Sequence, residues 1–275
     1  MRNTMSTPPE RSSGAILGLP GEVEGSAAFV YDGRGPRVSP AIEVQSWLDP
    51  KLVGEPVQDP SGVGVHALGF GVADVDAAVA ALTERGCRMV GHGEWLAHKR
   101  WATVRDANGV TLDIVGDDAV PSGETRMRHL RITCTDLSVS VPWYEGVGFE
   151  VLGQERVTDA TVVGLDGPVD AVAARLRLPD EPFEVLLIEW KDPKSHGRHY
   201  AEPNHAGIFR AAVGVDDTRA AYEAMSGAGW TFDRAPMLVE LKGTPVPDMW
   251  ICFISDPDGV PFEFVERPRS AFVKS

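Results

Sequence analysis

The fold is decided by residues 129–136, whose sequence is HLRITCTD. The apolar run in this stretch is typical of a buried strand, and Asp136 is placed to cap a helix that follows it. The expected helix carries Trp143 and Tyr144 and ends close to Gly148, after which a second strand begins. The stretch therefore predicts a strand, a helix and a returning strand.

Outside this stretch, the chain repeats itself. Four short motifs occur twice, in the same order and at nearly the same offset. The first copies lie at residues 18–21, 43–50, 71–74 and 106–109, and the second copies lie at 164–167, 186–193, 214–217 and 256–259. Such self-similarity indicates a duplicated domain.

The repeated unit is a strand, a helix and about three more strands. Because the strands outnumber what one helix can cover on both faces, we expect an α+β fold with helices outside curled, mostly antiparallel sheets. The predicted layout is a flexible tail at 1–13, a first domain at 14–116, a linker at 117–125, a second domain at 126–268 and a tail at 269–275. The opening strand and helix of the first domain are missing, so its first unit is expected to be truncated.

The composition restricts the possible partners. The chain has 275 residues, 43% of them hydrophobic, which is enough for two packed domains, and its net charge is −14. A chain this acidic is repelled by nucleic acid and by anionic membrane surfaces, so neither is an expected partner. Three cysteines without a CxxC pair, no signal-peptide pattern and no apolar run of membrane-spanning length predict a reduced, cytoplasmic protein.

These motifs resemble those of the vicinal oxygen chelate superfamily, which includes glyoxalases, bleomycin-resistance proteins and extradiol dioxygenases. The likeness is carried by residues 129–136, by the aromatic pair of the following helix and its exit at 146–149, and by the closing hairpin at 256–263, DPDGVPFE. The resemblance implies tandem βαβββ modules, two of which form one half-barrel cup with a site on its inner face. It therefore implies two cups, around residues 14–116 and 126–268, the first module being truncated.

In this superfamily the first and last strands of each module typically supply one metal ligand each. Only alternate strand residues face inward, so we place the four positions by their distance from the capping aspartate or from the turn. In the second cup they are His129, Leu186, Arg210 and Glu263. The resemblance thus implies that His129 and Glu263 face each other as ligands of a divalent metal, which would be iron, manganese, zinc or nickel. Two ligands are fewer than a catalytic site uses, so a third could come from the histidine-rich loop 195–205 or from His66.

The first cup offers a poorer ligand set. Its corresponding positions are Glu43, Ala67 and Asp113, and the fourth position is missing together with its strand. Two carboxylates without an imidazole make a poor transition-metal site. The first cup is therefore expected to be metal-free and to have a structural or substrate-shaping role.

The candidate catalytic residues are Glu263, His129 and Arg210, and the candidate substrate contacts are Arg210, Trp190 and Glu43. With a metal, the ion would stabilise an enolate while Glu263 moves a proton. Without a metal, Arg210 would stabilise the oxyanion, and His129 or Glu263 would be the general base. The alternatives are structural: Arg210 pairs with Glu263 in a salt bridge, His129 is hydrogen-bonded at the edge of the core, Trp190 packs, and Glu43 is an ordinary polar group lining its cup.

The expected function is that of a small-molecule enzyme of the vicinal oxygen chelate type, an isomerase, lyase or dioxygenase-like protein with its active site in the second domain. The alternative is a metal-free small-molecule binding or resistance protein of the bleomycin-resistance type. A third interpretation is a degenerate partner that acts mainly through dimerisation, and a homodimer is compatible with the tandem layout.

Overall fold

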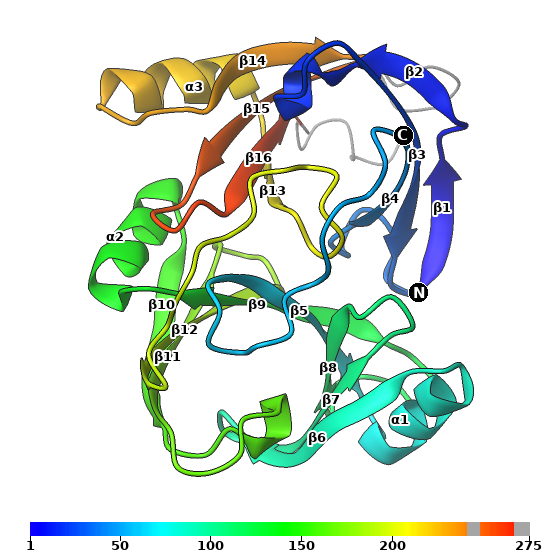
Figure 1. Ribbon diagram of the computed structural model, residues 1–275, viewed down its shortest axis with the longest axis vertical. Coiled ribbons are helices and arrows are strands. Elements are labelled where there is room, and N and C mark those ends of the chain that lie inside the picture. The colour runs from blue at the N-terminus through cyan, green and yellow to red at the C-terminus, as the bar shows by residue number, and fades with distance from the viewer. Residues whose placement is uncertain (241–247, 267–275) are drawn as a thin grey trace.

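Eight strands form one continuous curled sheet, called here the central sheet, which lies in the lower half of the view in Figure 1. The computed structural model describes residues 1–240 and 248–266. The strands of this central sheet are β5 (Gly64–Val72), β6 (Arg88–Trp95), β7 (His98–Arg105), β8 (Thr111–Gly116), β9 (Arg126–Cys134), β10 (Glu150–Val157), β11 (Asp170–Arg177) and β12 (Glu184–Asp192). Their order across the sheet is β10-β11-β12-β9-β5-β8-β7-β6, so the sheet contains two copies of the predicted unit side by side.

The two copies are joined at their first strands. β5 and β9 pair in antiparallel register, with Ala67 opposite Arg131 and Gly69 opposite His129. Within each copy the first strand also pairs in parallel with the last, β5 with β8 and β9 with β12. Residues of four different strands therefore meet at the centre of the sheet.

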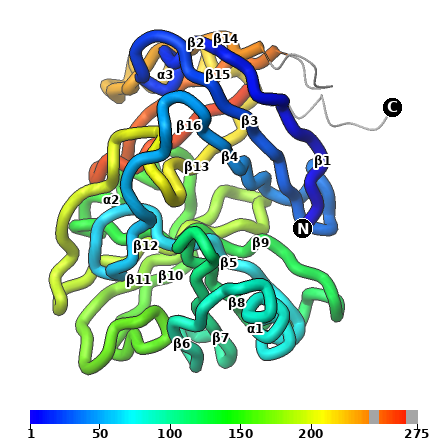
Figure 2. Tube along the Cα trace, turned by 45° about the vertical axis from the view of Figure 1, so that its right-hand side comes forward, coloured from blue at the N-terminus to red at the C-terminus, as the bar shows by residue number. Residues whose placement is uncertain are grey.

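Two smaller sheets come from the two ends of the described chain and lie together beside the central sheet (Figure 2). The N-terminal sheet contains β1 (Arg2–Ser6), β2 (Glu10–Ser13), β3 (Glu22–Tyr31) and β4 (Ile42–Asp49), and β3 pairs with the other three. The C-terminal sheet contains β13 (Ala211–Val215), β14 (Arg234–Val239), β15 (Met249–Ser255) and β16 (Pro261–Glu266), in the order β13-β16-β15-β14. Residues 1–63 contain no α-helix and only one 3-10 helix, η1 (Gly14–Leu17).

Each α-helix begins directly after a capping aspartate. The helices are α1 (Val75–Glu84), α2 (Leu137–Val147) and α3 (Thr218–Gly227), and their caps are Asp74, Asp136 and Asp217, whose side chains accept hydrogen bonds from backbone N–H groups of the first turn. Gly148 ends α2 with a φ of 112°, a left-handed conformation that glycine adopts without strain. The helix that the sequence predicts after Asp136 is thus confirmed.

The main apolar core lies around α2, between the central sheet and the C-terminal sheet (Figure 1). The ring of Tyr144 on α2 lies 5.5 Å from that of Phe149 and 5.4 Å from that of Phe262, in edge-to-face arrangements. Its hydroxyl donates to Asp256 Oδ2 over 3.0 Å. One helix therefore ties the C-terminal sheet to the central sheet through both apolar and polar contacts.

The buried carboxyl of Asp256 is expected to make stability fall as the pH rises. Burial raises the pKa of Asp256 from 3.8 to about 6, although hydrogen bonds from Val260 and Tyr144 lower it. Between these two values the unfolded chain binds fewer protons than the folded chain, so the free energy of unfolding decreases, by roughly 3 kcal/mol. Urea unfolding at about pH 4 and about pH 7 measures this decrease. The Asp256→Asn side chain cannot ionise, so this variant should not show the decrease. If the free energy of unfolding changed with pH in the same way in both proteins, Asp256 would not be its cause.

The α+β class with curled half-barrel sheets is confirmed, but the modules pair differently from the expectation. The cups around 14–116 and 126–268 do not form, because the central sheet continues across the predicted linker 117–125. β5 and β9 are buried along nearly their whole length, so each needs a backbone partner on both edges. Pairing with each other gives both strands this second partner. The N-terminal sheet and the C-terminal sheet, which are not part of the central sheet, then associate with each other.

The N-terminal segment also differs from the expectation. Residues 1–13 are not a flexible tail, because β1 and β2 pair with β3 and extend the N-terminal sheet. The 3-10 helix η1 follows β2 directly, and its first turn is capped by the hydroxyl of Ser13. The predicted tail 269–275, and the last two residues of the predicted second domain, lie outside the described residues.

Candidate functional site

The residues proposed from the sequence fall into two separate charged clusters. Glu43, Arg210 and Glu263 form the first, called here the terminal site, between the N-terminal and C-terminal sheets. His129 belongs to the second, called here the central site, where it contacts Asp113 on the inner face of the central sheet. The expectation that His129 and Glu263 face each other in one cup is wrong, because they lie on different sheets and have different partners.

In the terminal site one guanidinium bridges two carboxylates from different sheets. Arg210 Nε donates to Glu263 Oε2 over 2.5 Å, and Arg210 Nη2 donates to Glu43 Oε2 over 2.6 Å. Nη1 takes part in neither bond. The exposed fraction of the side chain is 27% for Glu43, 14% for Arg210 and 9% for Glu263, so solvent reaches this cluster. The predicted salt bridge is present, and a third predicted residue joins it.

Strand alternation explains why Glu263 faces this site. Its neighbours Phe262 and Phe264 both pack into the main apolar core, so Glu263 is turned to the opposite face of β16. Directly paired residues share a face, and the register places Arg234, Phe253 and Glu263 in one row across β14, β15 and β16. The terminal site is therefore built on the face of the C-terminal sheet that turns away from the core.

The electrostatics of the terminal site separate a proton acceptor from a permanent cation. Burial and the charge of Glu43 raise the pKa of Glu263, although Arg210 lowers it, and the net shift is upward. Burial lowers the pKa of Arg210, but the two glutamates outweigh it, so this pKa is raised above its ordinary value. A carboxylate with a raised pKa beside a fixed positive charge is suited to accepting a proton while the cation stabilises a developing anion.

The central site is a closed ion pair. Asp113 Oδ2 accepts from Arg131 Nε over 2.8 Å, its Oδ1 accepts from Thr103 over 3.0 Å, and His129 Nε2 lies 3.2 Å from Oδ2. The exposed fraction of the side chain is 0% for Asp113 and 2% for Arg131. Burial raises the pKa of Asp113, but the charge of Arg131 and the hydrogen bonds from His129 and Arg131 hold it below its usual value.

The partner that the sequence reasoning missed in the central site is Arg131. The available signal was its spacing, because Arg131 shares one face of the strand with His129 and Thr133, while Leu130 and Ile132 between them are apolar. Asp113 was placed in one cup and His129 in the other. Only the pairing of β5 with β9 brings these two positions together.

The inner face of the central sheet is filled by side chains. Residues 158–169, which include the 3-10 helix η2 (Thr161–Val163), pack against it, and its apolar cluster contains Trp95, Trp101 and Trp190. Trp190 is 1% exposed and donates from Nε1 to Thr133 Oγ1 over 3.3 Å. Trp190, a predicted substrate contact, therefore packs inside the core and does not line the mouth of a cup.

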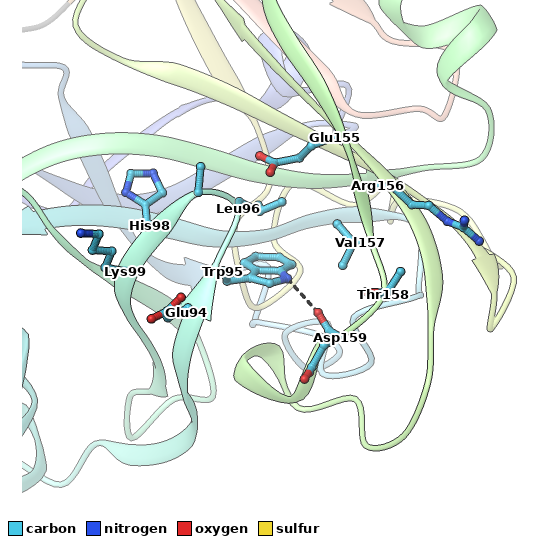
Figure 3. Close-up of a pocket in the computed structure, with 11 residues that line it drawn as sticks. Glu94, Trp95, Leu96, His98, Lys99, Glu155, Arg156, Val157, Thr158 and Asp159 are labelled. Atoms are coloured by element: carbon cyan, nitrogen blue, oxygen red, sulfur yellow. Dashed lines mark hydrogen bonds between the residues drawn. The ribbon is translucent and has the colours of Figure 1, made fainter.

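A surface pocket of about 310 Å³ opens at the rim of this filled face (Figure 3). It lies between the turn that joins β6 to β7 and the end of β10, and Trp95, His98 and Glu155 are among its lining residues. Burial, together with the charges of His129 and nearby arginines, lowers the pKa of His98 to about 4. The lining mixes both signs of charge and contains none of the predicted site residues, so we do not identify it as the site.

The donor set does not fit the metal that the superfamily implies. Among residues 1–240 and 248–266, no group of three or more His, Cys, Asp or Glu side chains could hold a metal ion. In the terminal site an arginine bridges the two carboxylates, and in the central site an arginine is bound to the single carboxylate; a guanidinium offers no lone pair to a metal. His129 and Glu263, the two predicted ligands, lie in different clusters.

The further histidines considered as third ligands have other partners. His66 Nε2 lies 2.6 Å from Gly62 O, and His199 Nε2 lies 2.7 Å from Phe209 O. His196 pairs with Asp59, and His205 Nδ1 lies 2.8 Å from Ala206 O. None of these contacts brings a histidine to Glu263 or to Asp113.

Comparisons with known proteins give one matching family model and several similar solved structures. A family model for the Glyoxalase/Bleomycin resistance protein/Dioxygenase superfamily matches residues 126–264, about half of the chain. Glyoxalase I from Zea mays is similar with a TM-score of 0.67 at 17% identity, over 98% of this chain and 84% of that chain. A putative dioxygenase from Bacillus subtilis is similar with a TM-score of 0.55 at 12% identity, over 96% and 76% of the two chains. No curated protein matches the sequence.

At such low identities the structural similarity shows a shared fold alone. Within the part of the chain that the structure describes, no helix is long and apolar enough to cross a membrane.

Proposed function

Because the chain belongs to the Glyoxalase/Bleomycin resistance protein/Dioxygenase superfamily, we propose that it is a small-molecule enzyme that moves a proton next to a substrate carbonyl. The active site of this proposal is the terminal site. The single observation that carries it is the bridging of Glu43 and Glu263 by Arg210, at three positions where the superfamily typically places metal ligands. No step of the proposed reaction passes through a metal.

Each residue of the terminal site has a role in this reaction. The carboxylate of Glu263 accepts the proton from the carbon next to the carbonyl, and its raised pKa makes it a better proton acceptor than an ordinary glutamate. Arg210 faces the oxygen that becomes the enolate, using Nη1, which neither glutamate engages. When Glu263 is protonated it no longer neutralises Arg210, so the positive charge of Arg210 becomes available as the enolate forms. Glu43 holds the guanidinium in place.

Accessibility favours the terminal site over the central site. The acid and the arginine of the central site are closed off from solvent, and the side chain of its His129 is 9% exposed. In the terminal site Glu263 is equally buried at 9%, but the side chains of Glu43 and Arg210 are 27% and 14% exposed. A substrate needs such access. The central site is therefore assigned a structural role.

A metal-free binding protein of the bleomycin-resistance type remains the second candidate function. The observation that favours it is that Arg210 is already paired with two carboxylates, an arrangement that needs no reaction to justify it. Binding of a carbonyl compound without proton exchange would favour this candidate.

Exchange of a substrate proton for deuterium tests the enzymatic proposal. In deuterium oxide, the wild-type protein is expected to speed the exchange of the C3 protons of 2-oxo-4-phenylbutanoate, measured by proton NMR. Glu263→Gln should slow this exchange by about 100-fold or more, because general-base catalysis typically contributes that much. The matched control is Glu266→Gln. Glu266 lies on the same strand, and its side chain accepts from Thr218 N at the start of α3. Equal losses in both variants would contradict the role of Glu263.

A further inference from the structure

A second arginine, Arg234, shares the face of the C-terminal sheet that carries Glu263. The register places Arg234 on β14 directly opposite Phe253 on β15, and Phe253 directly opposite Glu263 on β16. The guanidinium carbons of Arg210 and Arg234 lie 5.9 Å and 5.5 Å from the centroid of the Phe253 ring. Two cations therefore flank one aromatic ring next to the proposed proton acceptor.

The two arginines differ in their partners. Arg210 is bound by two glutamates, whereas Arg234 Nη1 donates to a neutral group, the backbone carbonyl of Ile16, over 3.2 Å. Within residues 1–240 and 248–266, no acidic side chain forms an ion pair with Arg234. The positive charge of Arg234 is thus not neutralised by a carboxylate of the described chain.

The connection between β2 and β3 approaches Arg234 closely at Gly18, which follows η1. A Cβ atom at Gly18 would lie 2.0 Å from Arg234 Nη2, and Gly18 has a φ of 75°, which glycine adopts without strain. The backbone around η1 therefore lies against this guanidinium and limits where it can move. A guanidinium held in place presents its donors in a fixed fork that matches a carboxylate.

We infer that Arg234 binds a carboxylate of the substrate, so that the substrate class of the terminal site is a 2-oxo carboxylate. Because the guanidinium carbons of Arg210 and Arg234 lie 5.9 Å and 5.5 Å from the centroid of the same ring, one small molecule that carries a carbonyl and a neighbouring carboxylate can engage both cations. Two glutamates and Arg210 alone carry a net negative charge, which would repel an anion, and Arg234 brings the cluster to neutrality. This inference rests on the proposed function for the identity of the reacting group.

The chemical step is balanced without a co-reactant. The C3 proton moves to the carboxylate of Glu263, and the electrons of the C–H bond form a double bond between C2 and C3. The π electron pair of the C2 carbonyl moves to its oxygen, which faces Arg210. Return of a solvent-derived deuteron from Glu263 to C3 restores the 2-oxo acid with one deuterium. Throughout this exchange the carboxylate stays on Arg234.

The test compares two probes on the wild-type protein, so that it does not depend on a variant that folds. The probes are 2-oxo-4-phenylbutanoate and its methyl ester, which keeps the 2-oxo group but has no negative charge. Saturation-transfer NMR and calorimetry are expected to show that the acid binds at least about tenfold more tightly than the ester, which is the typical contribution of a charge-assisted hydrogen bond.

Variants then locate the difference on Arg234. Arg234→Met should lower the affinity for the acid to that for the ester. Arg234→Lys keeps the positive charge but loses the two parallel N–H donors of the guanidinium, so its affinity for the acid should be intermediate. The control is Arg219→Met, because Arg219 lies over the ring of Trp250, 4.8 Å from its centroid, and belongs to α3 outside the row. Circular dichroism and thermal unfolding confirm that each variant is folded.

The outcomes separate this inference from the proposed function. Equal binding of acid and ester, or no binding of either at millimolar concentration, would overturn the assignment of Arg234. If the ester exchanged its protons as fast as the acid, the proton transfer would stand and the role of Arg234 would fall. If the acid bound through Arg234 but the wild-type protein did not exchange its C3 protons, the role of Arg234 would be supported and the proposed reaction would be contradicted.

Discussion

Replacing Arg210 with histidine is expected to turn the terminal site into a zinc site. Arg210 Nε lies 2.5 Å from Glu263 Oε2, and the Nε2 atom of a histidine is as many bonds from Cα as the Nε atom of an arginine. Glu43 already approaches the same guanidinium from the opposite sheet. Arg210→His would therefore offer one imidazole and two carboxylates, the three protein ligands that a catalytic zinc site uses.

The expected result is about one zinc ion per chain, bound with a Kd on the order of 1 μM or lower, which corresponds to about 8 kcal/mol. Calorimetry and metal analysis after dialysis measure it. Zinc should also raise the unfolding temperature of this variant, because it binds only the folded chain. Arg210→Ala is the matched control: it removes the same cation but supplies no imidazole, and should bind zinc about a hundredfold more weakly or not at all.

Two results would contradict this reasoning. A folded Arg210→His protein with no more zinc than Arg210→Ala would show that the three positions do not converge as the hydrogen bonds indicate. A wild-type protein with stoichiometric zinc lost in Glu263→Gln would show that the guanidinium does not exclude a metal.

Replacing Arg131 with methionine should destabilise the protein by about 3–5 kcal/mol. Methionine keeps the length and apolar character of the side chain but leaves the carboxylate of Asp113 buried without its cation, which is the costly way to break a buried ion pair. Urea unfolding measures the loss. Adding Asp113→Asn to the same chain removes the unpaired charge and should recover most of the stability. The double variant thus separates the ion pair from the packing of Arg131.

The control for this prediction lies on the same strand. Arg128 pairs with Asp117 over 3.4 Å, but its side chain is 35% exposed, so Arg128→Met should cost no more than about 1 kcal/mol. Similar losses for Arg128→Met and Arg131→Met would contradict the buried ion pair. Proton exchange at the terminal site should persist in all folded variants of the central site.

The pH dependence of these variants gives an independent readout. In the wild type the folded pKa of Asp113 lies below its unfolded value of 3.8, so the contribution of the pair is present above that value and is lost as the pH falls through the folded pKa. In Arg131→Met the charge and the hydrogen bond of the arginine are removed, whereas burial, which raises the pKa of Asp113, and the contact with His129, which lowers it, both remain. The variant should therefore lose less stability than the wild type as the pH falls.

The two charged clusters have similar chemistry but are assigned different roles, one structural and one catalytic. In each, an arginine pairs with a carboxylate: Arg131 with Asp113 in the central site, and Arg210 with Glu43 and Glu263 in the terminal site. The central arginine is sealed beneath tryptophans and the loop 158–169, whereas the terminal one lies between two sheets that solvent reaches. Access, and not the chemistry of the charged groups, distinguishes a structural ion pair from a candidate active site here.

Local patterns in the sequence predicted much of the fold. The aspartates that cap helices, the strand alternation around Glu263 and the turn at 256–259 depend on neighbours within a few residues, so they can be identified without the rest of the molecule. The same alternation placed Glu43, Arg210 and Glu263 among the inward positions, and the structure brings these three together. The edge strand β14, which contains Pro236, had no such pattern, and Arg234 was missed with it.

What the sequence by itself determined is the repeated strand–helix–strand unit, the superfamily resemblance and the face of each strand on which a charged residue lies. What only the tertiary structure decided is which units share a sheet. A strand has the same alternation whichever neighbour it pairs with, and the choice of neighbour depends on burying the edges and faces of all the units at once. The pairing of β5 with β9 put His129 beside Asp113 and left Glu263 to Glu43 from the other end of the chain.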